Sequence, residues 1–330
     1  MVEFKKILKQ SNFLVTGGAG FIGSNLVEYL IINGAKSVRV LDNLSTGLFK
    51  NIQEFENLPN FEFMKGDICN LDDCMTACAG MDYVSHQAAL GSVPRSINDP
   101  ITTNNVNISG FLNMLIASRD QKVKRFVYAA SSSTYGDSKS LPKVEDVIGK
   151  PLSPYAVTKY VNELYADVFA NLYGMQSIGL RYFNVFGPKQ NPSGAYAAVI
   201  PSFIGSILNE DAPYINGDGE QTRDFTYVEN VIQANVRALL SDNSDAINQV
   251  YNIAIGDRTS LNQLFHVLAE IESKQIEPIY RDSRAGDVRD SLADISKSER
   301  LLGYKPNIGL VDGLRKTYFW FKSQMYNDQS

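Results

Sequence analysis

The sequence has 330 residues, of which 44% are hydrophobic and 20% charged, so it can fill the core of one large domain or of two joined domains and is not disordered. Thirty-one basic and thirty-six acidic residues give a formal net charge of −5, which argues against a nucleic-acid partner. No apolar run approaches the length of a membrane span, and the first ten residues are too polar for a secretory signal. We therefore expect a soluble, cytoplasmic protein with no membrane partner.

Histidine and cysteine are too few for the common metal sites. His86 and His266 are the two histidines, which excludes a His-rich zinc site, and we expect no bound metal. Cys69, Cys74 and Cys78 follow a C-x4-C-x3-C spacing, which misses the C-x4-C-x2-C iron–sulfur pattern by one residue and lacks a fourth ligand. We interpret the cysteines as small apolar residues on a helix, in a protein of a reducing compartment.

The first half of the chain alternates short apolar runs with segments of helical periodicity. In chain order the pattern predicts a helix in 1–10, a strand at 13–16, a helix at 21–32, strands at 37–41, 60–64 and 83–86, a helix at 100–118, a strand at 125–130, a helix at 153–172 and a strand at 176–182. Strands separated by helices indicate right-handed crossovers. The expected fold is therefore α/β, a Rossmann-type doubly wound parallel sheet with helices on both faces.

The pattern loosens beyond Gly187, where prolines are frequent and the elements are short and mixed. We expect residues 1–186 to form the main domain and residues 187–330 to form a smaller, mixed α/β domain. A strand near 250–254 is expected to return to the main sheet, so the boundary is interleaved.

The loop after the first strand is rich in glycine. Gly17, Gly20 and Gly23 fit G-x-x-G-x-x-G, and with Gly18 the loop also fits G-x-G-x-x-G. Glycine permits the tight turn and the close approach of a pyrophosphate, which the N–H groups at a helix N-terminus attract. Asp42, 19 residues after Gly23, can accept hydrogen bonds from ribose hydroxyls and repels a 2′-phosphate. The loop predicts an NAD site rather than an NADP site; an ordinary tight turn is the alternative.

Tyr155 and Lys159 lie one helical turn apart, on a helix expected to begin at Ser153 and Pro154. A free phenol titrates near pH ~10, so a tyrosine base at neutral pH needs its pKa lowered by about three units. A nearby ammonium and a cationic nicotinamide can together meet that demand. Ser131 opens a serine cluster just after a strand, where α/β sheets bind ligands. A chance Tyr–Lys pair and an ordinary polar turn are the alternatives.

Five motifs in order along the chain are Gly17-x-x-Gly20-x-x-Gly23, Asp42-Asn43-Leu44, the Ser131–Gly136 segment, Tyr155-x-x-x-Lys159 and Arg181-Tyr182-Phe183-Asn184. They resemble the extended short-chain dehydrogenase/reductase family and, within it, the UDP-hexose 4-epimerases, above all the UDP-N-acetylglucosamine 4-epimerases of bacterial surface-polysaccharide pathways. The likeness runs along nearly the whole chain. It implies a Rossmann sheet with a smaller substrate domain, the cofactor NAD, and a homodimer formed through the helices near 100–118 and 153–172.

The resemblance also implies a mechanism. Tyr155 takes the proton of the sugar 4-hydroxyl while hydride passes from C4 to NAD, Lys159 lowers the pKa of Tyr155, and Ser131 positions the 4-oxygen. The 4-keto sugar turns over and hydride returns to its opposite face, so NAD is regenerated in each cycle. His86 matches a scaffold position and has no expected catalytic role.

The binding residues follow from the resemblance. It places the cofactor on Gly17, Gly20, Phe21, Ile22, Gly23, Asp42, Asn43, Ser45, Thr46, Gly47, Asp67, Ile68, Gln87, Ala88, Ala89, Tyr155, Lys159 and Val185. It places the UDP-sugar on Gly91, Ser92, Ser131, Ser132, Ser133, Asn184, Ala198, Val199, Tyr214, Ile215, Asn216, Arg223, Arg284, Asp287 and Ser291. For Asp67 a helix N-cap is the alternative role. Arg223 and Arg284 are expected to hold the diphosphate, with solvated surface arginines as the alternative.

Ser291 stands where epimerases of non-acetylated hexoses typically carry a tyrosine, so the resemblance implies room for an acetamido group at C2. The small Ala198 favours the same interpretation, whereas a Ser291 outside the pocket is the alternative. We expect a UDP-GlcNAc/UDP-GalNAc 4-epimerase that supplies surface polysaccharide synthesis. The alternatives are a UDP-glucose or UDP-uronate 4-epimerase, a nucleotide-sugar dehydratase or decarboxylase, and a non-enzymatic NAD-sensing scaffold. A dehydratase needs an Asp-Glu pair where Ser132 and Ser133 stand.

Overall fold

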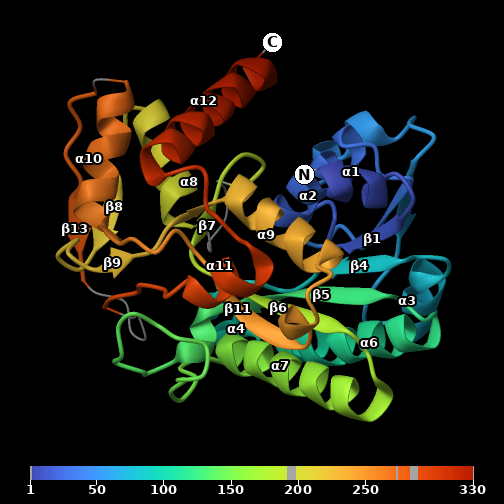
Figure 1. The fold of residues 1–330 in the computed structure, drawn as a ribbon. Coiled ribbons are helices and arrows are strands. Elements are labelled where there is room, and N and C mark those ends of the chain that lie inside the picture. The colour runs from blue at the N-terminus through green and yellow to red at the C-terminus, as the bar shows by residue number, and fades with distance from the viewer. Residues whose placement is uncertain (1, 192–197, 273, 283–288, 330) are drawn as a thin grey trace.

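The computed structural model describes residues 2–191, 198–272, 274–282 and 289–329 (Figure 1). Within these residues, seven strands that all pair in parallel form the central sheet. In sheet order the strands are β11 (Gln249–Ile253), β6 (Ser177–Tyr182), β5 (Arg125–Ser131), β4 (Tyr83–His86), β1 (Asn12–Thr16), β2 (Ser37–Asp42) and β3 (Phe61–Lys65). The expected doubly wound parallel sheet is confirmed, and β11 lies at its edge beside β6.

The inner strands are buried on both faces, as parallel sheets covered by helices require. β6 is buried at every residue, and β1 and β5 at nearly every residue, which explains their continuous apolar runs. One face is covered by α2 (Phe21–Ile32) and α9 (Val228–Leu240), and the other by α3 (Leu71–Cys78), α6 (Gly110–Asp120) and α7 (Pro154–Tyr173). Figure 1 shows α9 above the sheet and α6 and α7 below it.

The helix that carries Tyr155 and Lys159 has defined ends. Ser153 is the N-cap of α7, because its hydroxyl accepts a hydrogen bond from the Ala156 N–H at 3.1 Å, and Pro154 occupies the first turn. Gly174 ends the helix in the left-handed conformation, with φ of 65°. α7 packs against β5 and β6. Its defined N-terminus therefore places Tyr155, in the first turn of the helix, at the edge of the sheet.

The helix predicted over 100–118 is interrupted. α5 (Pro100–Asn104) runs into a π-helical turn at Asn105–Ser109 before α6 begins. Inside this turn the buried Asn107 side chain accepts from the Leu90 N–H and donates to the Leu90 carbonyl and the Thr158 hydroxyl. The turn therefore ties the loop after β4 to α7, as π-bulges near functional sites commonly do.

Most elements after residue 187 lie beside the sheet edge and form small two-stranded sheets with helices around them. The strands are β7 (Val185–Phe186) with β10 (Thr226–Tyr227), β8 (Tyr214–Asn216) with β13 (Ile279–Arg281), and β9 (Thr222–Arg223) with β12 (Thr259–Ser260). The remaining helices are α1 (Val2–Leu8), α4 (Val93–Asn98), α8 (Val199–Leu208), α10 (Leu261–Ile271), α11 (Ser296–Leu302) and α12 (Leu310–Gln329). α8, α10 and α12 pack together. The domain division at 186 and 187 stays a prediction.

Two expectations need correction. Cys74 and Cys78 are buried on α3 as expected, but Cys69 is exposed in the turn before that helix. The second half holds two long helices, α9 and α12, that the sequence pattern did not predict. Within the described residues, no helix combines the length and the apolar character that crossing a bilayer requires.

Candidate active site

A cavity of about 380 Å³ opens at the carboxyl edge of the sheet. Its walls follow the strand ends: Gly17 after β1, Asp42 at the end of β2, Gln87 after β4, Ser131 ending β5 and Tyr182 ending β6. Every residue expected to contact the cofactor, from Gly17 to Val185, lines it. Lining residues that the sequence did not predict are Leu41, Gly66, Leu90, Val106, Ala129, Ala130 and Tyr182. Most of them are chain neighbours of a predicted residue, which is the signal that could have found them.

The glycine loop cannot carry side chains where it bends. Gly17 has φ of +66°, and a Cβ there would lie 2.7 Å from the backbone nitrogen of Ala88. A Cβ on Gly23 would collide with the Gly17 carbonyl oxygen. α2 starts after Gly20 with no side-chain cap, so the N–H groups of its first turn are left for a ligand. This geometry suits the pyrophosphate of a dinucleotide.

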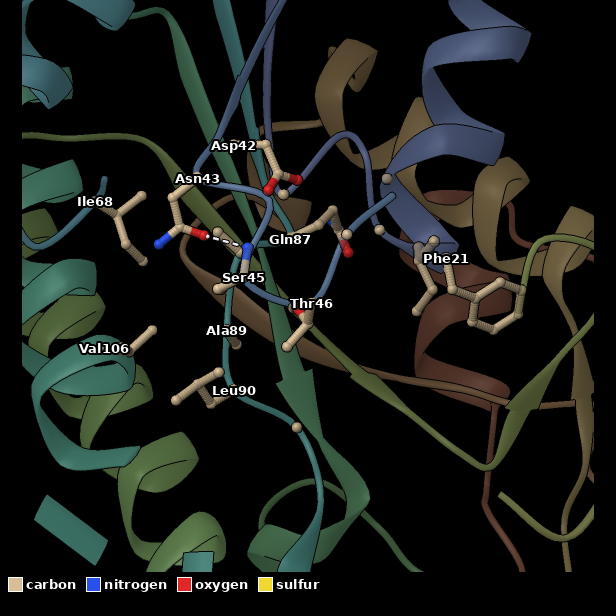
Figure 2. Close-up of a pocket in the computed structure, with 18 of the residues that line it drawn as sticks. Phe21, Asp42, Asn43, Ser45, Thr46, Ile68, Gln87, Ala89, Leu90 and Val106 are labelled. Atoms are coloured by element: carbon tan, nitrogen blue, oxygen red, sulfur yellow. Dashed lines mark hydrogen bonds between the residues drawn. The ribbon is translucent and has the colours of Figure 1, made fainter. Parts of the chain in front are cut away.

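The residues for the adenosine end surround the end of β2. Asp42 is 8% exposed, and its carboxylate accepts hydrogen bonds from the Ala19 N–H at 3.0 Å and the Leu44 N–H at 2.8 Å. Burial raises the pKa of Asp42 while these two donors oppose the shift. Each carboxylate oxygen keeps acceptor capacity for a ribose hydroxyl. Figure 2 shows Asp42 and Asn43 at this end, with Ser45 donating its N–H to the Asn43 side chain.

Asp67 faces the same end of the cavity. Its carboxylate accepts from the Cys69 N–H at 2.8 Å and from the Asn43 side chain at 3.1 Å. Burial raises the pKa of Asp67, but the hydrogen bonds from Cys69 and Asn43 outweigh it and the pKa is lowered. The N-cap of α3 is Asn70, so the alternative role for Asp67 is wrong. Asp42 ends β2, and Asp67 follows the end of β3. Two carboxylates at this end of the cavity fit NAD and disfavour the additional 2′-phosphate of NADP.

Tyr155, Ser131 and Lys159 meet at the opposite end of the cavity, where β5 ends. Tyr155 and Ser131 both line the cavity, and the Ser131 side chain bonds the Ser133 hydroxyl at 2.8 Å. Lys159 is 3% exposed, and its ammonium donates to the Ala129 carbonyl at 2.8 Å, 5.9 Å from the centre of the Tyr155 ring. The structure thus brings together the three residues expected to be catalytic.

Burial dominates the protonation of this cluster. Burial raises the pKa of Tyr155, and the Ser131 side chain opposes this shift. Burial lowers the pKa of Lys159 to about 8, and the charge of Glu163 opposes this shift. Burial also lowers the pKa of His86 to about 3, so this residue stays neutral and bonds the Thr16 hydroxyl at 2.8 Å. In the protein without a ligand, burial therefore disfavours a phenolate at Tyr155.

Replacing Lys159 with Met is expected to stabilise the cofactor-free protein at pH 7, by about 1–3 kcal/mol. The folded Lys159 has a pKa of about 8 and the unfolded one ~10.4, so the unfolded state holds more protons between these values. The destabilisation of the folded protein by the buried Lys159 ammonium is therefore complete below about pH 8. It fades as the pH rises from there towards ~10.4, the pKa of the unfolded lysine. Urea unfolding of both proteins at pH 7 and pH 10 checks this; a stability difference that is equal at the two pH values contradicts it.

The residues expected to bind the UDP-sugar are spread more widely. Gly91, Ser131 and Asn184 line the cavity, and Ser132 and Ser133 follow Ser131 in a short 3₁₀ turn. The other residues are not among the lining residues of the cavity. Ser92 caps α4, Ala198 and Val199 begin α8, and Tyr214, Ile215 and Asn216 form β8. Arg223 lies on β9, and Ser291 lies next to β9, bonded to the Thr222 carbonyl. Arg284 and Asp287 lie outside the described residues.

A buried carboxylate holds the Ser291 segment in place. Asp224 is fully buried and accepts from the N–H groups of Ala293, Gly256 and Ile255 at 3.1–3.2 Å. Burial raises the pKa of Asp224 to about 7, against these three donors. The Ser291 N–H donates to the Thr222 carbonyl at 3.1 Å, so the segment runs along β9. No motif marks this anchor in the sequence beyond its place next to Arg223.

Known proteins share this arrangement. Residues 13–254 match the NAD dependent epimerase/dehydratase family. A putative UDP-glucose 4-epimerase of Methanocaldococcus jannaschii is 40% identical, over 94% of this chain and 98% of the relative. A solved UDP-N-acetylglucosamine 4-epimerase from Methanobrevibacter ruminantium M1, in complex with UDP-N-acetylmuramic acid, is 41% identical with a TM-score of 0.90, over 96% of this chain and 99% of that one.

A second solved relative holds the cofactor. The UDP-glucuronic acid 4-epimerase from Bacillus cereus, in complex with UDP-glucuronic acid and NAD, is 35% identical with a TM-score of 0.88, over 95% of this chain and 99% of that one. The glycine loop, the two carboxylates and the Tyr155–Lys159 pair fit the same cofactor here. The chain belongs to the NAD-dependent epimerase/dehydratase family, within the extended short-chain dehydrogenases/reductases, and its cofactor is NAD.

Proposed function

We propose that this protein is a UDP-sugar 4-epimerase that interconverts UDP-GlcNAc and UDP-GalNAc through a 4-keto sugar. The observation that carries the proposal is the cluster at the end of β5, where Tyr155 and Ser131 line a cavity that fits NAD and the Lys159 ammonium lies 5.9 Å from the centre of the Tyr155 ring. The similarity to epimerases over nearly the whole chain supports the reaction class.

Each residue of the cluster has one task. Bound NAD, held by the glycine loop and Asp42, would supply the hydride acceptor for C4 of the sugar and the donor for its return to the opposite face. Tyr155 takes the proton of the 4-hydroxyl and gives it back, as a general base and then a general acid. Ser131 donates a hydrogen bond to the 4-oxygen, which holds that oxygen beside the phenol. Lys159 keeps a positive charge near the Tyr155 ring, which favours the phenolate.

The substrate proposal rests on the second half of the chain. Tyr214, Ile215 and Asn216 on β8 are proposed to hold the uridine, and Arg223 with Arg284 the diphosphate, which suits the bidentate fork of a guanidinium. Ser291 and Ala198 are small, which leaves space for an acetamido group at C2. The relatives include enzymes of UDP-glucose and UDP-glucuronate, so the sugar has to be tested directly.

Dehydration is the second candidate reaction, and the serine cluster disfavours it. Ser132 and Ser133 stand where the Asp-Glu pair of a dehydratase is expected, and Ser133 is hydrogen-bonded to Ser131. Hydroxyls with a pKa far above neutrality do not remove a C5 proton. The protein is therefore proposed to return the 4-keto sugar to a 4-hydroxyl without losing water.

Incubation of the purified protein with UDP-GlcNAc, and no added cofactor, tests the proposal. Ion-pair chromatography should separate UDP-GalNAc from the remaining UDP-GlcNAc, because NAD stays bound and is regenerated. Parallel reactions with UDP-glucose and UDP-glucuronate identify the preferred sugar. A 4-keto-6-deoxy product, or turnover of UDP-glucose alone, refutes the proposed function.

We also propose that the protein is a cytoplasmic homodimer, with α7 at the interface. Val157, Leu164, Val168 and Leu172 form one exposed apolar stripe on α7, each between 45% and 70% exposed. α5, which packs on α7, adds Ile101. A continuous apolar face of this kind marks a protein interface. Cys69, Cys74 and Cys78 are free thiols, which suits a reducing cytoplasm.

Replacing both Leu164 and Val168 with Glu is expected to give a monomer, because two buried charges at the interface would lack partners. Light scattering after size-exclusion chromatography measures the mass. Ile32→Glu is the matched control, since Ile32 is 71% exposed on α2, away from α7. A double variant that keeps the wild-type mass contradicts the interface.

A further inference from the structure

Three buried side chains, of Ser85, Tyr182 and Asn235, and the half-buried Gln87 form a closed hydrogen-bond network at the wall of the cofactor cavity. The Asn235 amide donates to the Tyr182 hydroxyl at 2.9 Å, and the Tyr182 hydroxyl donates to the Gln87 carbonyl oxygen at 3.2 Å. Gln87 donates to the Asn235 carbonyl oxygen at 3.0 Å and to the Ser85 hydroxyl at 2.9 Å. Three bonds therefore form a ring in which each residue donates to the next, the arrangement in which hydrogen bonds strengthen one another.

Asn235 is the member with no remaining capacity. Its oxygen accepts from Gln87 and Ser85, and its NH₂ group donates to Tyr182 and to the Val231 carbonyl. Its donors and acceptors are all used, which a fully buried amide requires. A polar residue on the buried face of α9 is costly unless it is satisfied in this way, so its place in the ring explains its presence there.

The ring joins α9 to two strands that are not neighbours in the sheet. Gln87 follows β4, Tyr182 ends β6, and β5 lies between these strands. The register pairs Ser85 with Val127 and Tyr182 with Ser131, so the β5 side chain between them on that face is Ala129. Its methyl group leaves space for the ring to cross β5. The carbonyl oxygen of the same Ala129 accepts the hydrogen bond from the Lys159 ammonium.

We propose that Asn235 is a positioning residue for NAD, which acts by fixing Gln87 and Tyr182 in the cavity wall. Both residues line the cavity that holds Tyr155 and Lys159, whereas Asn235 does not. Without Asn235 the two side chains would each lose a partner, and the wall beside the end of β5 would no longer have a single arrangement. The inference concerns the cofactor and holds whichever sugar is the substrate.

The two tyrosines of the cavity differ in their partners. Tyr182 donates its proton to Gln87, and burial raises the pKa of Tyr182 to about 12, against its hydrogen bonds with Asn235 and Gln87. Tyr182 therefore remains a neutral phenol across the physiological range. Burial raises the pKa of Tyr155 as well, but Tyr155 lies outside the ring, with the Lys159 ammonium 5.9 Å from the centre of its own ring.

The rate at which NAD leaves the purified, NAD-loaded protein tests this role. Asn235→Leu should release NAD about tenfold faster, as expected when buried polar groups lose their partners. Asn230→Leu is the matched control: Asn230 is equally buried on the same helix, but it bonds Asn307 and Ile308 instead of the cavity wall. This control should lower the melting temperature and leave the NAD release rate within about twofold of wild type.

A second variant separates the ring from general destabilisation. Tyr182→Phe removes one hydroxyl, and it should speed NAD release about fivefold. The double variant with Asn235→Leu should match Asn235→Leu alone, because both changes break the same ring. Equal NAD release from Asn235→Leu and Asn230→Leu, or independent effects in the double variant, overturns the proposal. If Asn235→Leu does not fold, the NAD release rate of Tyr182→Phe is the deciding measurement. A rate equal to that of the wild type overturns the proposal.

Discussion

Tyr155→Phe is expected to lower the turnover of UDP-GlcNAc by about 10³-fold or more, while the purified protein keeps its NAD. The phenol is the group placed to exchange the 4-hydroxyl proton, and loss of a general acid–base typically costs about 10²–10⁴-fold. The change removes one oxygen atom and leaves the ring, so the packing of α7 is kept. Steady-state rates, with the nucleotide content of the same sample, give both quantities.

Tyr165→Phe is the control for this variant, since Tyr165 lies on the same helix and packs against the core instead of the cavity. It should keep near wild-type turnover. A Tyr155→Phe protein with more than a tenth of the wild-type rate would mean that another group moves the proton. The variant also addresses the NAD-sensing alternative, because a sensor needs no acid–base group and would work without the Tyr155 hydroxyl.

Ser291→Tyr is expected to lower kcat/KM for UDP-GlcNAc by about 100-fold and to leave kcat/KM for UDP-glucose within about threefold. A tyrosine would fill the space proposed for the acetamido group, and steric exclusion discriminates more strongly than the loss of one contact, which is worth about 1–3 kcal/mol. The Ser291 segment is held by backbone hydrogen bonds to Thr222 and by Asp224, so it cannot easily move away from the added ring.

Ser291→Ala is the control, because it removes the hydroxyl without filling the space, and it should keep the wild-type preference. Equal losses on both substrates in Ser291→Tyr would indicate a damaged fold. Retained turnover of UDP-GlcNAc would place Ser291 outside the sugar pocket and remove the main support for an acetylated substrate.

The sheet was predictable because its inner strands are buried on both faces and bounded by polar turns. β4 and α2 have the predicted ends. α9 was not predicted, because ten of its residues are buried and its polar face is only a narrow stripe of Glu229, Gln233 and Arg237. The buried Asn230 and Asn235 weaken its pattern further, although tertiary hydrogen bonds satisfy both. α12 was missed as well; it contains Gly313, which packs against Phe186 and Tyr227.

The site divides in the same way. The cofactor residues cluster at strand ends and at one glycine loop, so local motifs locate them, and all line one cavity. Tyr182 and Asn235 were not predicted as site residues, because their roles depend on contacts between β6, α9 and the loop after β4 that lie far apart in the chain. The proposed UDP-sugar residues come from separate short elements, which local sequence does not assemble into one surface.

The account depends on hydride leaving C4 of a UDP-amino sugar and returning to the same carbon within the protein. UDP-GlcNAc that carries deuterium at C4, incubated in ordinary water with no added cofactor, tests this directly. Mass spectrometry and proton NMR should find UDP-GalNAc that keeps the deuterium at C4. Replacement of that deuterium by solvent hydrogen, or no UDP-GalNAc at all, would contradict the account.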